Sequence, residues 1–293
     1  MNHALTASEC GRVSAVAGQA QREMREWAAA YPSLFSAKPF DPALFGTLAL
    51  ASAFSGPWLS AERLRMANRV CLWCFGLDWL IDYVATSTAE VEEIVSRCLA
   101  VADGAPPARG DDLTCFLADI RDELADTPAF PALRAVWLDD LRRVLGAMTL
   151  ETAWKAGHSS GDRPLPTFEE YLGNADNLGF SFVFDAHWIF TAESAPIGDL
   201  TPVREASWAV QRVIRLLNDI GTYHRDLAWG DLNALMLGVS RDEVDSRLAD
   251  LVARGRELIR PLRQDHPRLA AYLERQMDFC AGFYHVTDYW GEL

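Results

Sequence analysis

The sequence predicts an all-α protein built as a single domain, and three observations support this. No segment alternates apolar and polar residues as a half-buried strand does, and no Asn-Gly or Asp-Gly turn joins two such segments. Capping boxes, in which a Ser or Thr is followed three residues later by Glu, mark helix starts at Ser87, Thr167 and Ser240. Two segments, 60–85 and 201–227, are apolar nearly all round, which is typical of central, buried helices.

The predicted helices follow one another between recognisable breaks. The helix that begins at Ser87 ends before Gly104–Pro107, and a later one ends before Gly161–Pro164. Thr201 followed by Pro202 begins another helix, with proline in its first turn. The predicted helices span about 8–30, 42–54, 60–85, 88–103, 112–125, 131–156, 167–191, 201–227, 241–264 and 267–290, with a break expected after Leu172 in the seventh.

Length and composition favour one large domain. The chain has 293 residues, of which 50% are hydrophobic, so it can bury a sizeable core. No low-complexity linker or repeat divides it, and we therefore predict one domain over residues 1–293. Residues 1–30 are expected to form an N-terminal helical segment that is a candidate for mobility.

The charge of the chain excludes some classes of partner. With 27 basic and 41 acidic residues the net charge is −14, which disfavours binding to nucleic acid or to an anionic membrane. Among the basic residues only Lys38 and Lys155 are lysine, a bias common in GC-rich bacterial genomes. The most apolar run, Val70–Leu77, is too short to span a membrane.

The cysteines indicate a reducing compartment. Six are scattered along the chain, and no signal peptide precedes them, so we expect a cytoplasmic bacterial protein with reduced thiols. Cys71 and Cys74 form a CxxC without a second pair or a nearby His, which favours core packing over zinc or redox chemistry.

A row of oxygen donors lies on the second central helix. Asn218, Thr222 and Asp226 are spaced by four residues, so on a helix they share one face. An amide oxygen, a hydroxyl and a carboxylate are hard ligands that suit Mg²⁺, whose coordination is usually completed by water and substrate phosphate. The alternative is an ordinary polar stripe facing solvent.

A second acidic face lies on the first central helix. Asp78 and Asp82 are also four residues apart, among apolar neighbours, and two carboxylates on one buried turn repel each other unless a cation or proton is present. The alternative places both at a solvated helix end. If the two central helices face each other, the gap between them is a multi-metal site for a polyphosphate.

Basic and aromatic residues near these faces are further candidates for substrate binding. Arg225 lies beside Asp226 and is placed to bind a phosphate oxygen, whereas Arg215 is equally compatible with a structural ion pair. Aromatic rings stabilise cations, although at helical spacing they also serve as plain core. The aromatic candidates are Phe75, Trp79, Phe180, Phe184, Trp188, Tyr284 and Tyr289, with Phe283 and Trp290 nearby.

The two acidic motifs together resemble those of class I terpene synthases. That family carries an aspartate-rich DDxxD or DxxxD motif, matched here by Asp78–Asp82, and well over a hundred residues later NDxx(S/T)xx(K/R)(E/D), matched by Asn218–Asp226. The resemblance covers about residues 40–290 and is closest to the bacterial single-domain form. It implies the terpenoid synthase fold, an α-helical bundle around a central active-site cavity.

The resemblance also implies the chemistry. Three Mg²⁺ ions are expected with the substrate diphosphate, two held by Asp78 and Asp82 and one by Asn218, Thr222 and Asp226. Departure of the diphosphate gives an allylic carbocation, which is cyclised or rearranged in an aromatic-lined, water-excluding cavity. Arg225 is implied as a diphosphate ligand. Asp219 has no expected metal role, because it lies about 100° around the helix from Asn218.

The sequence departs from the family pattern at several positions. Trp79 stands where many members have a second aspartate, and Asp226 replaces the commoner Glu. Ala175 stands where bacterial sesquiterpene synthases have a diphosphate-sensing arginine, with Leu178 as the linker and Gly179 as the effector position of the same break. Asp288-Tyr289 replaces a C-terminal Arg-Tyr pair.

These departures favour a C20 substrate. The segment from Tyr171 to Gly179 is more similar to diterpene synthases, including those that act on labdane-type bicyclic diphosphates. The expected substrate is therefore geranylgeranyl diphosphate or a bicycle made by a class II cyclase, to which the enzyme would be functionally coupled. The chain itself has no DxDD motif of class II activity.

Four alternatives compete with this assignment. A sesquiterpene synthase would take farnesyl diphosphate. A squalene/phytoene synthase-like condensing enzyme would need a second DxxxD motif where Asn218 and Thr222 stand, and a chain-elongating prenyltransferase would need a second aspartate-rich motif. A helical interaction protein would show neither magnesium dependence nor a closed apolar cavity. Homodimerisation is common in such bundles.

Overall fold

The structure, a computed structural model, describes residues 5–192 and 199–291, so residues 1–4 of the predicted N-terminal segment lie outside it. The described residues form helices and contain no strand, which confirms the all-α prediction. The helices are α1 (Ala7–Ala30), α2 (Pro32–Phe35), α3 (Pro42–Ser55), α4 (Ala61–Trp79), α5 (Thr88–Ala102), α6 (Asp112–Ala125), α7 (Phe130–Ser160), α8 (Phe168–Gly173), α9 (Phe180–Thr191), α10 (Thr201–Trp229), α11 (Arg241–Asp265) and α12 (Pro267–Tyr284).

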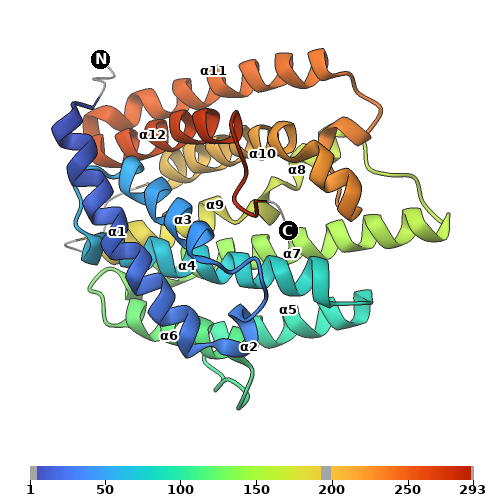
Figure 1. The fold of residues 1–293 in the computed structure, drawn as a ribbon, viewed down its shortest axis with the longest axis horizontal. Coiled ribbons are helices and arrows are strands. Elements are labelled where there is room, and N and C mark those ends of the chain that lie inside the picture. The colour runs from blue at the N-terminus through green and yellow to red at the C-terminus, as the bar shows by residue number, and fades with distance from the viewer. Residues whose placement is uncertain (1–4, 193–198, 292–293) are drawn as a thin grey trace.

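The helices form a bundle around two central members. In Figure 1, α11 and α12 lie along the upper side and α5 and α6 along the lower side, with α4, α9 and α10 between them. Helix α10 contacts α11, α12 and α9, and α4 contacts α9, α1 and α3. Helix α1 packs on α3 and α4 through buried residues that include Val13, Ala20 and Met24, so residues 7–30 belong to the packed bundle.

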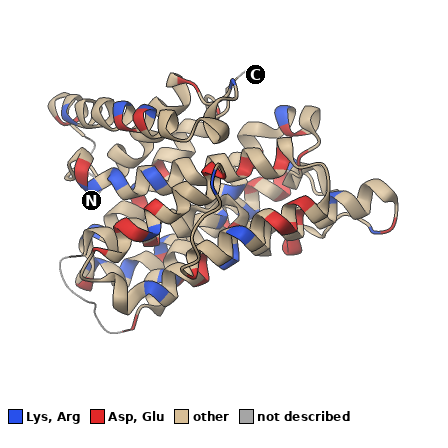
Figure 2. Ribbon diagram, turned by 90° about the horizontal axis from the view of Figure 1, so that it is seen from below, with Lys and Arg blue, Asp and Glu red and all other residues tan. Residues whose placement is uncertain are grey.

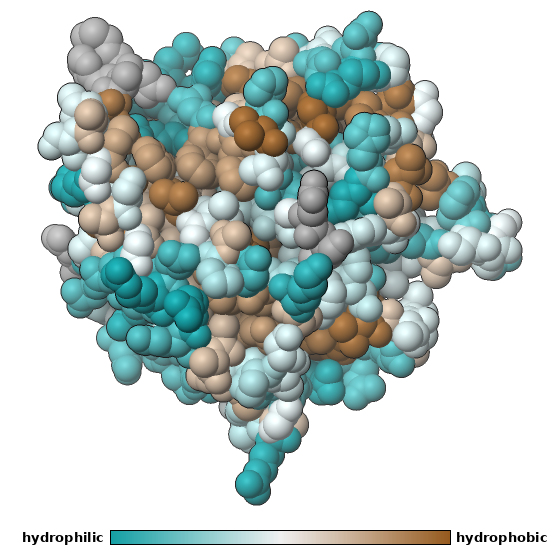
Figure 3. Space-filling model, viewed as in Figure 1, coloured by the Kyte–Doolittle hydropathy of each residue, from teal (hydrophilic) through white to brown (hydrophobic). Residues whose placement is uncertain are grey.

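Both central helices are buried as their sequences predict. Between Val203 and Ile220 only Glu205 is exposed, and within α4 only Glu62 is. On the face of the molecule seen in Figure 3, apolar residues form small patches separated by hydrophilic ones. Figure 2 shows acidic and basic residues interspersed along the helices, without a broad basic face in that view. Within the described ranges, no helix has the length and apolar character needed to cross a membrane.

Local signals explain most helix ends. The capping boxes at Thr167 and Ser240 are present, and a further one at Thr6 was not predicted. At Ser87 only half of the capping box is present: the Ser87 side chain accepts from the backbone N–H of Glu90. The Glu90 carboxylate accepts from the backbone N–H of Thr86, at 2.6 Å, and not from that of Ser87. Thr201 is the first residue of α10 and not a cap.

The break expected after Leu172 in segment 167–191 is present: α8 ends at Gly173 and is followed by a 3₁₀ turn, Ala175–Leu178, and Gly179 then adopts φ +72°, a left-handed conformation that glycine tolerates and a helix interior does not. Two other predicted helices differ from the structure where tertiary contacts intervene. The segment 60–85 ends in a π-helical turn, Leu80–Val84. The segment 267–290 ends as a helix at Tyr284, after which the chain turns back over the bundle (Figure 1).

Helices α10 and α12 approach each other closely at Gly221, where a Cβ atom would lie 2.7 Å from the backbone oxygen of Tyr284. We predict that Gly221→Ala lowers the free energy of unfolding by about 1–3 kcal/mol, because one helix must shift away from the other. Gly146→Ala on the exposed face of α7 is the matched control, since nothing lies within 4 Å of its Cβ position. It should leave stability unchanged or raise it by up to about 1 kcal/mol. Chemical denaturation measures both, and equal stabilities would contradict the predicted close packing.

Candidate active site

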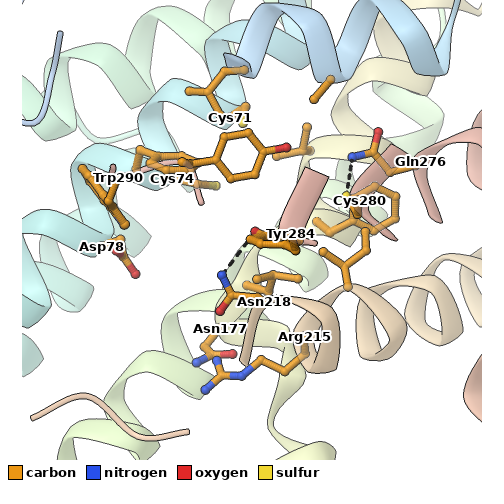
Figure 4. A pocket seen from close by; sticks show the side chains of 18 of the residues that line it. Cys71, Cys74, Asp78, Asn177, Arg215, Asn218, Gln276, Cys280, Tyr284 and Trp290 are labelled. Carbon is orange, nitrogen blue, oxygen red and sulfur yellow. Dashed lines mark hydrogen bonds between the residues drawn. The ribbon is translucent and has the colours of Figure 1, made fainter. Parts of the chain in front are cut away.

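A cavity lies between α4, α7, α9, α10 and α12 and the segment that follows α12 (Figure 4). The C-terminal parts of α4, α7, α10 and α12 meet at one end of it, where they contribute Asp78, Glu151, Asp226 and Tyr284 to the lining. Because the C-terminal end of a helix carries partial negative charge, the helix ends already favour a cation there. We call this the acidic end of the cavity.

Asp78 and Asp82 form the first wall of the acidic end. Both line the cavity, and the Asp82 side chain is 20% exposed. Asp82 belongs to the π-helical turn that ends the first central helix, a local widening often found at functional sites. Burial raises the pKa of Asp78 well above its usual range, and the nearby carboxylates of Asp82 and Asp231 raise it further.

Asn218, Thr222 and Asp226 form the facing wall. The Asn218 amide donates to the Tyr284 hydroxyl at 3.2 Å, and among the described residues none donates to its side-chain oxygen. The Thr222 hydroxyl donates to Asp226 Oδ2 at 2.6 Å, and the Asn233 amide donates to the same oxygen at 2.8 Å. Asn218 and Asp226 line the cavity, whereas Thr222 is buried behind them.

Lys155 and Asp231 also belong to the acidic end, and sequence analysis did not single them out. The Lys155 ammonium donates to Asp82 at 2.5 Å and lies 3.4 Å from Asp231. The Tyr83 hydroxyl donates to Asp231 at 2.6 Å. Only weak sequence signals point to these two residues. Lys155 is one of two lysines and follows Glu151 by one helical turn, and Asp231 comes five residues after the second acidic motif.

Arg215 lies at the centre of a buried network beside the acidic end. Its guanidinium donates to the Tyr171 hydroxyl at 2.8 Å and lies 3.4 Å from carboxylate oxygens of Glu151 and Asp219. The Tyr171 hydroxyl in turn donates to Asp219 at 2.9 Å. Burial raises the pKa of Asp219 to about 7, although Arg215 and Tyr171 act against this. Arg215 therefore lines the cavity, as a substrate-binding residue would, and also forms structural ion pairs, which were the alternative interpretation from the sequence.

Arg225 is held by two carboxylates. It lies 3.0 Å from Asp226 and 2.9 Å from Asp288, and its guanidinium stands 5.3 Å from the centre of the Trp229 ring. Asp288 belongs to the segment after α12, so this ion pair fastens that segment across the cavity. Arg225 lines the cavity, but a phosphate would have to share it with Asp288.

The structure brings most of the predicted aromatic residues to the cavity. Three predicted residues are not among the described residues that line the cavity: Trp79, Trp188 and Gly179. The Trp79 ring packs against that of Tyr83, and Trp188 is packed in the core. Cys71 and Cys74, expected to be plain core, do line it, with all six thiols free. The aromatic residues that line it are Phe75, Tyr83, Phe180, Phe184, Tyr272, Tyr284, Tyr289 and Trp290.

The donor chemistry of the two walls fits Mg²⁺. Every candidate ligand is an oxygen, and the carboxylates of Asp78, Asp82 and Asp231 share one side of the cavity with Lys155 as their nearest cation. In the described part of the chain, no group of three or more His, Cys, Asp or Glu side chains is close enough to hold an ion alone. This agrees with the habit of Mg²⁺ in phosphate-binding sites, where one or two carboxylates are supplemented by water and phosphate oxygens.

Comparison with known proteins gives consistent results. Residues 69–258 match the family model described as terpene synthase family 2, C-terminal metal binding. Over 275 residues the chain is 28% identical to the ent-pimara-9(11),15-diene synthase of Streptomyces sp. (strain KO-3988), covering 92% of this chain and 90% of that protein.

Two solved structures have a similar fold. The linalool/nerolidol synthase from Streptomyces clavuligerus, in complex with 2-fluorogeranyl diphosphate, superposes with a TM-score of 0.70 at 16% identity over 92% of this chain and 97% of that one. The 2-methylisoborneol synthase from Streptomyces coelicolor A3(2), in complex with Mg²⁺ and 2-fluoroneryl diphosphate, gives 0.71 at 14% identity over 91% of each chain.

Replacing Lys155 tests the charge balance of the acidic end. We predict that Lys155→Met lowers the free energy of unfolding by about 1–3 kcal/mol without divalent metal, because Asp82 and Asp231 lose their shared cation. This loss of unfolding free energy is smaller than the one expected for a fully buried ion pair, because the Lys155 side chain is 21% exposed. Added Mg²⁺ should stabilise this variant more than the parent. Lys38→Met, at the other and exposed lysine, is the control and should change neither quantity. Equal behaviour of the two variants in denaturation would refute the proposed balance.

Proposed function

The chain belongs to terpene synthase family 2 and is a class I terpene synthase, and we propose that its substrate is a C20 prenyl diphosphate, ionised with Mg²⁺ and converted to a diterpene. The observation that carries this proposal is the pair of facing oxygen-donor walls, Asp78 with Asp82 and Asn218 with Asp226, at one end of a cavity otherwise lined mainly by apolar and aromatic residues.

The C20 assignment is supported by two observations. The relative with 28% identity is named for a pimaradiene, a diterpene. The cavity is also long: Tyr272 and Tyr284 both line it and are twelve residues apart on α12, which corresponds to roughly 18 Å. We propose geranylgeranyl diphosphate or a labdane-type bicyclic diphosphate from a class II cyclase as the substrate. A farnesyl diphosphate-dependent sesquiterpene synthase is the competing assignment.

The acidic end supplies the groups for ionisation. We propose that Asp78 and Asp82 hold two Mg²⁺ ions and that Asn218, Thr222 and Asp226 hold a third. When bound, Mg²⁺ supplies Lewis-acid charge that stabilises the leaving diphosphate. Lys155, Arg215 and Arg225 add positive charge from the protein at the same end. They do so in a chain that has Ala175 in place of the diphosphate-sensing arginine.

The rest of the cavity suits the cation that remains. The carbon–oxygen bond breaks with both electrons going to diphosphate, which leaves positive charge on the hydrocarbon. The faces of Phe75, Phe180 and Phe184 line the cavity and stabilise such charge through their quadrupoles. Tyr289 and Trp290, from the segment after α12, close the cavity against water, which would otherwise intercept the cation prematurely.

The substrate proposal is tested with purified protein and Mg²⁺, offering farnesyl, geranylgeranyl and copalyl-type diphosphates and analysing extracts by gas chromatography. We expect a diterpene from a C20 substrate. Turnover of farnesyl diphosphate alone would favour the sesquiterpene alternative, and a head-to-head C30 or C40 product would favour a condensing enzyme. No product from any of them would refute the proposal.

The proposed metal ligands are tested by Asp78→Ala and Asn218→Ala. Each should lower kcat/KM by at least about 100-fold while the circular dichroism spectrum is kept, because each removes an oxygen from one wall. Glu205→Ala, on the exposed part of α10, should leave kcat/KM unchanged and is the control. Near-parental turnover in both wall variants would remove this metal assignment.

Asp288 is predicted to weaken diphosphate binding by occupying Arg225. Asp288→Asn should tighten the binding of inorganic diphosphate in the presence of Mg²⁺ by roughly threefold to tenfold, since one negative charge is removed and Arg225 is released. Isothermal titration calorimetry measures this, with Asp126→Asn at an exposed helix end as the control. Weaker binding by Asp288→Asn would contradict the competition.

A further inference from the structure

The end of the cavity opposite the acidic end carries several polar side chains among its apolar ones. Tyr284 marks the acidic end through its hydrogen bond with Asn218. On the same face of α12, Gln276 and Tyr272 lie two and three turns away, roughly 12 and 18 Å. On α4, Asn68 lies ten residues before Asp78, roughly 15 Å. Figure 4 shows Gln276 and Asn218 on different sides of the pocket.

Helix α3 closes this end and ties α4 to α12. The Ser52 hydroxyl donates to the Asn68 side-chain oxygen at 2.7 Å, and the Ser55 hydroxyl donates to the Gln276 oxygen at 2.5 Å. Ser52, Asn68 and Gln276 all line the cavity, together with Tyr272. We call these four residues the polar floor.

The polar floor holds hydrogen-bonding groups without adequate partners. Asn68 Nδ2 is fully buried with no acceptor among the described residues. The Tyr272 hydroxyl has no hydrogen bond to any described residue, although Tyr272 is only 4% exposed. The Gln276 amide reaches only the sulfur of Cys280, a weak acceptor, at 3.5 Å (Figure 4). Burial raises the pKa of Tyr272, and the thiols of Cys71 and Cys280 raise it further, which agrees with a hydroxyl enclosed beside these cavity-lining residues.

A hydrocarbon alone does not account for such a floor. Each buried donor without a partner costs stability, and apolar side chains of similar size would contact an isoprenoid tail at no such cost. Several convergent donors and acceptors in a roomy buried site are instead the conditions under which a water molecule is held. The oxygen of a water molecule, or of a hydroxyl group on a ligand, would supply a partner for the Tyr272 hydroxyl or the Gln276 amide, both of which line the cavity.

We propose that the polar floor holds a water molecule that adds to the final carbocation, so that the product of this enzyme is an alcohol. This inference rests on the proposed function. The carbon–oxygen bond to diphosphate breaks first, with both electrons leaving on diphosphate. The water oxygen then forms a new bond to the cationic carbon, and the proton that it loses ends on the released diphosphate. The net reaction consumes one water molecule for each diphosphate released.

The test is turnover of the C20 substrate in H₂¹⁸O, with mass spectrometry of the product. We expect an alcohol that carries ¹⁸O. A hydrocarbon product would overturn the water-holding floor while leaving the terpene synthase assignment intact. An alcohol without ¹⁸O, formed only from a substrate that already bears a hydroxyl group, would also overturn it and would assign the floor to that hydroxyl.

The variant Tyr272→Phe localises the water. It should shift the ratio of alcohol to hydrocarbon at least tenfold towards hydrocarbon, whereas Tyr223→Phe, the same chemical change outside the cavity, should keep the parental ratio. An unchanged ratio in Tyr272→Phe would contradict the role of this hydroxyl.

A second measurement needs no turnover and therefore decides the matter even if no offered substrate reacts. If water is held, Tyr272→Phe loses hydrogen bonds and its denaturation midpoint falls below that of Tyr223→Phe. If the hydroxyl is truly unpartnered, its removal raises the midpoint, and that result would overturn the inference.

Discussion

The repulsion among carboxylates enclosed at one end of the cavity is the constraint on which the site depends. Asp78, Asp82, Asp231 and Asp226 come from two central helices and the turn after the second, and burial makes their charges costly without cations nearby. Lys155 reaches two of them. The remaining demand for positive charge makes this end of the bundle suited to metal ions and, in the proposed function, to their diphosphate.

Such a site must be kept open by its surroundings, because apolar helices otherwise pack together. A second network lies beside the acidic end and is formed by Tyr171, Arg215 and Asp219. The Tyr171 hydroxyl on α8 accepts from Arg215 at 2.8 Å and donates to Asp219 at 2.9 Å, which links α8 to α10. Arg215 also reaches Glu151 on α7. A buried network of this kind fixes the positions of three helices, since breaking any member leaves an unpaired charge. Asp219 therefore has a positioning role, in accord with its place around the helix from Asn218.

The sequence predicts the parts of this arrangement that depend on neighbours along the chain. Helical periodicity and capping locate α3, α5, α6 and α11 closely, and spacing by four residues places Asp78 with Asp82 and Asn218 with Asp226. It does not predict Lys155 or Asp231, because their importance arises from contacts across the bundle: Lys155 reaches both Asp82 and Asp231. The left-handed Gly179 and the π-helical turn at Asp82 are likewise set by packing, which overrides the local preference for a continuous helix.

The cavity is therefore graded along its length, and the grading assigns a direction to the substrate. The acidic end cannot accept a hydrocarbon without leaving its carboxylates buried and unsolvated, and the aromatic middle cannot accept a diphosphate without stripping it of its hydration. In the proposed reaction the diphosphate lies towards Asp78 and Asp226, so the distal isoprene units would meet Asn68 and Tyr272. In that proposal, positive charge that migrates along the chain during cyclisation moves away from the diphosphate and towards the polar floor. On this view, the polar floor determines where the cation is quenched.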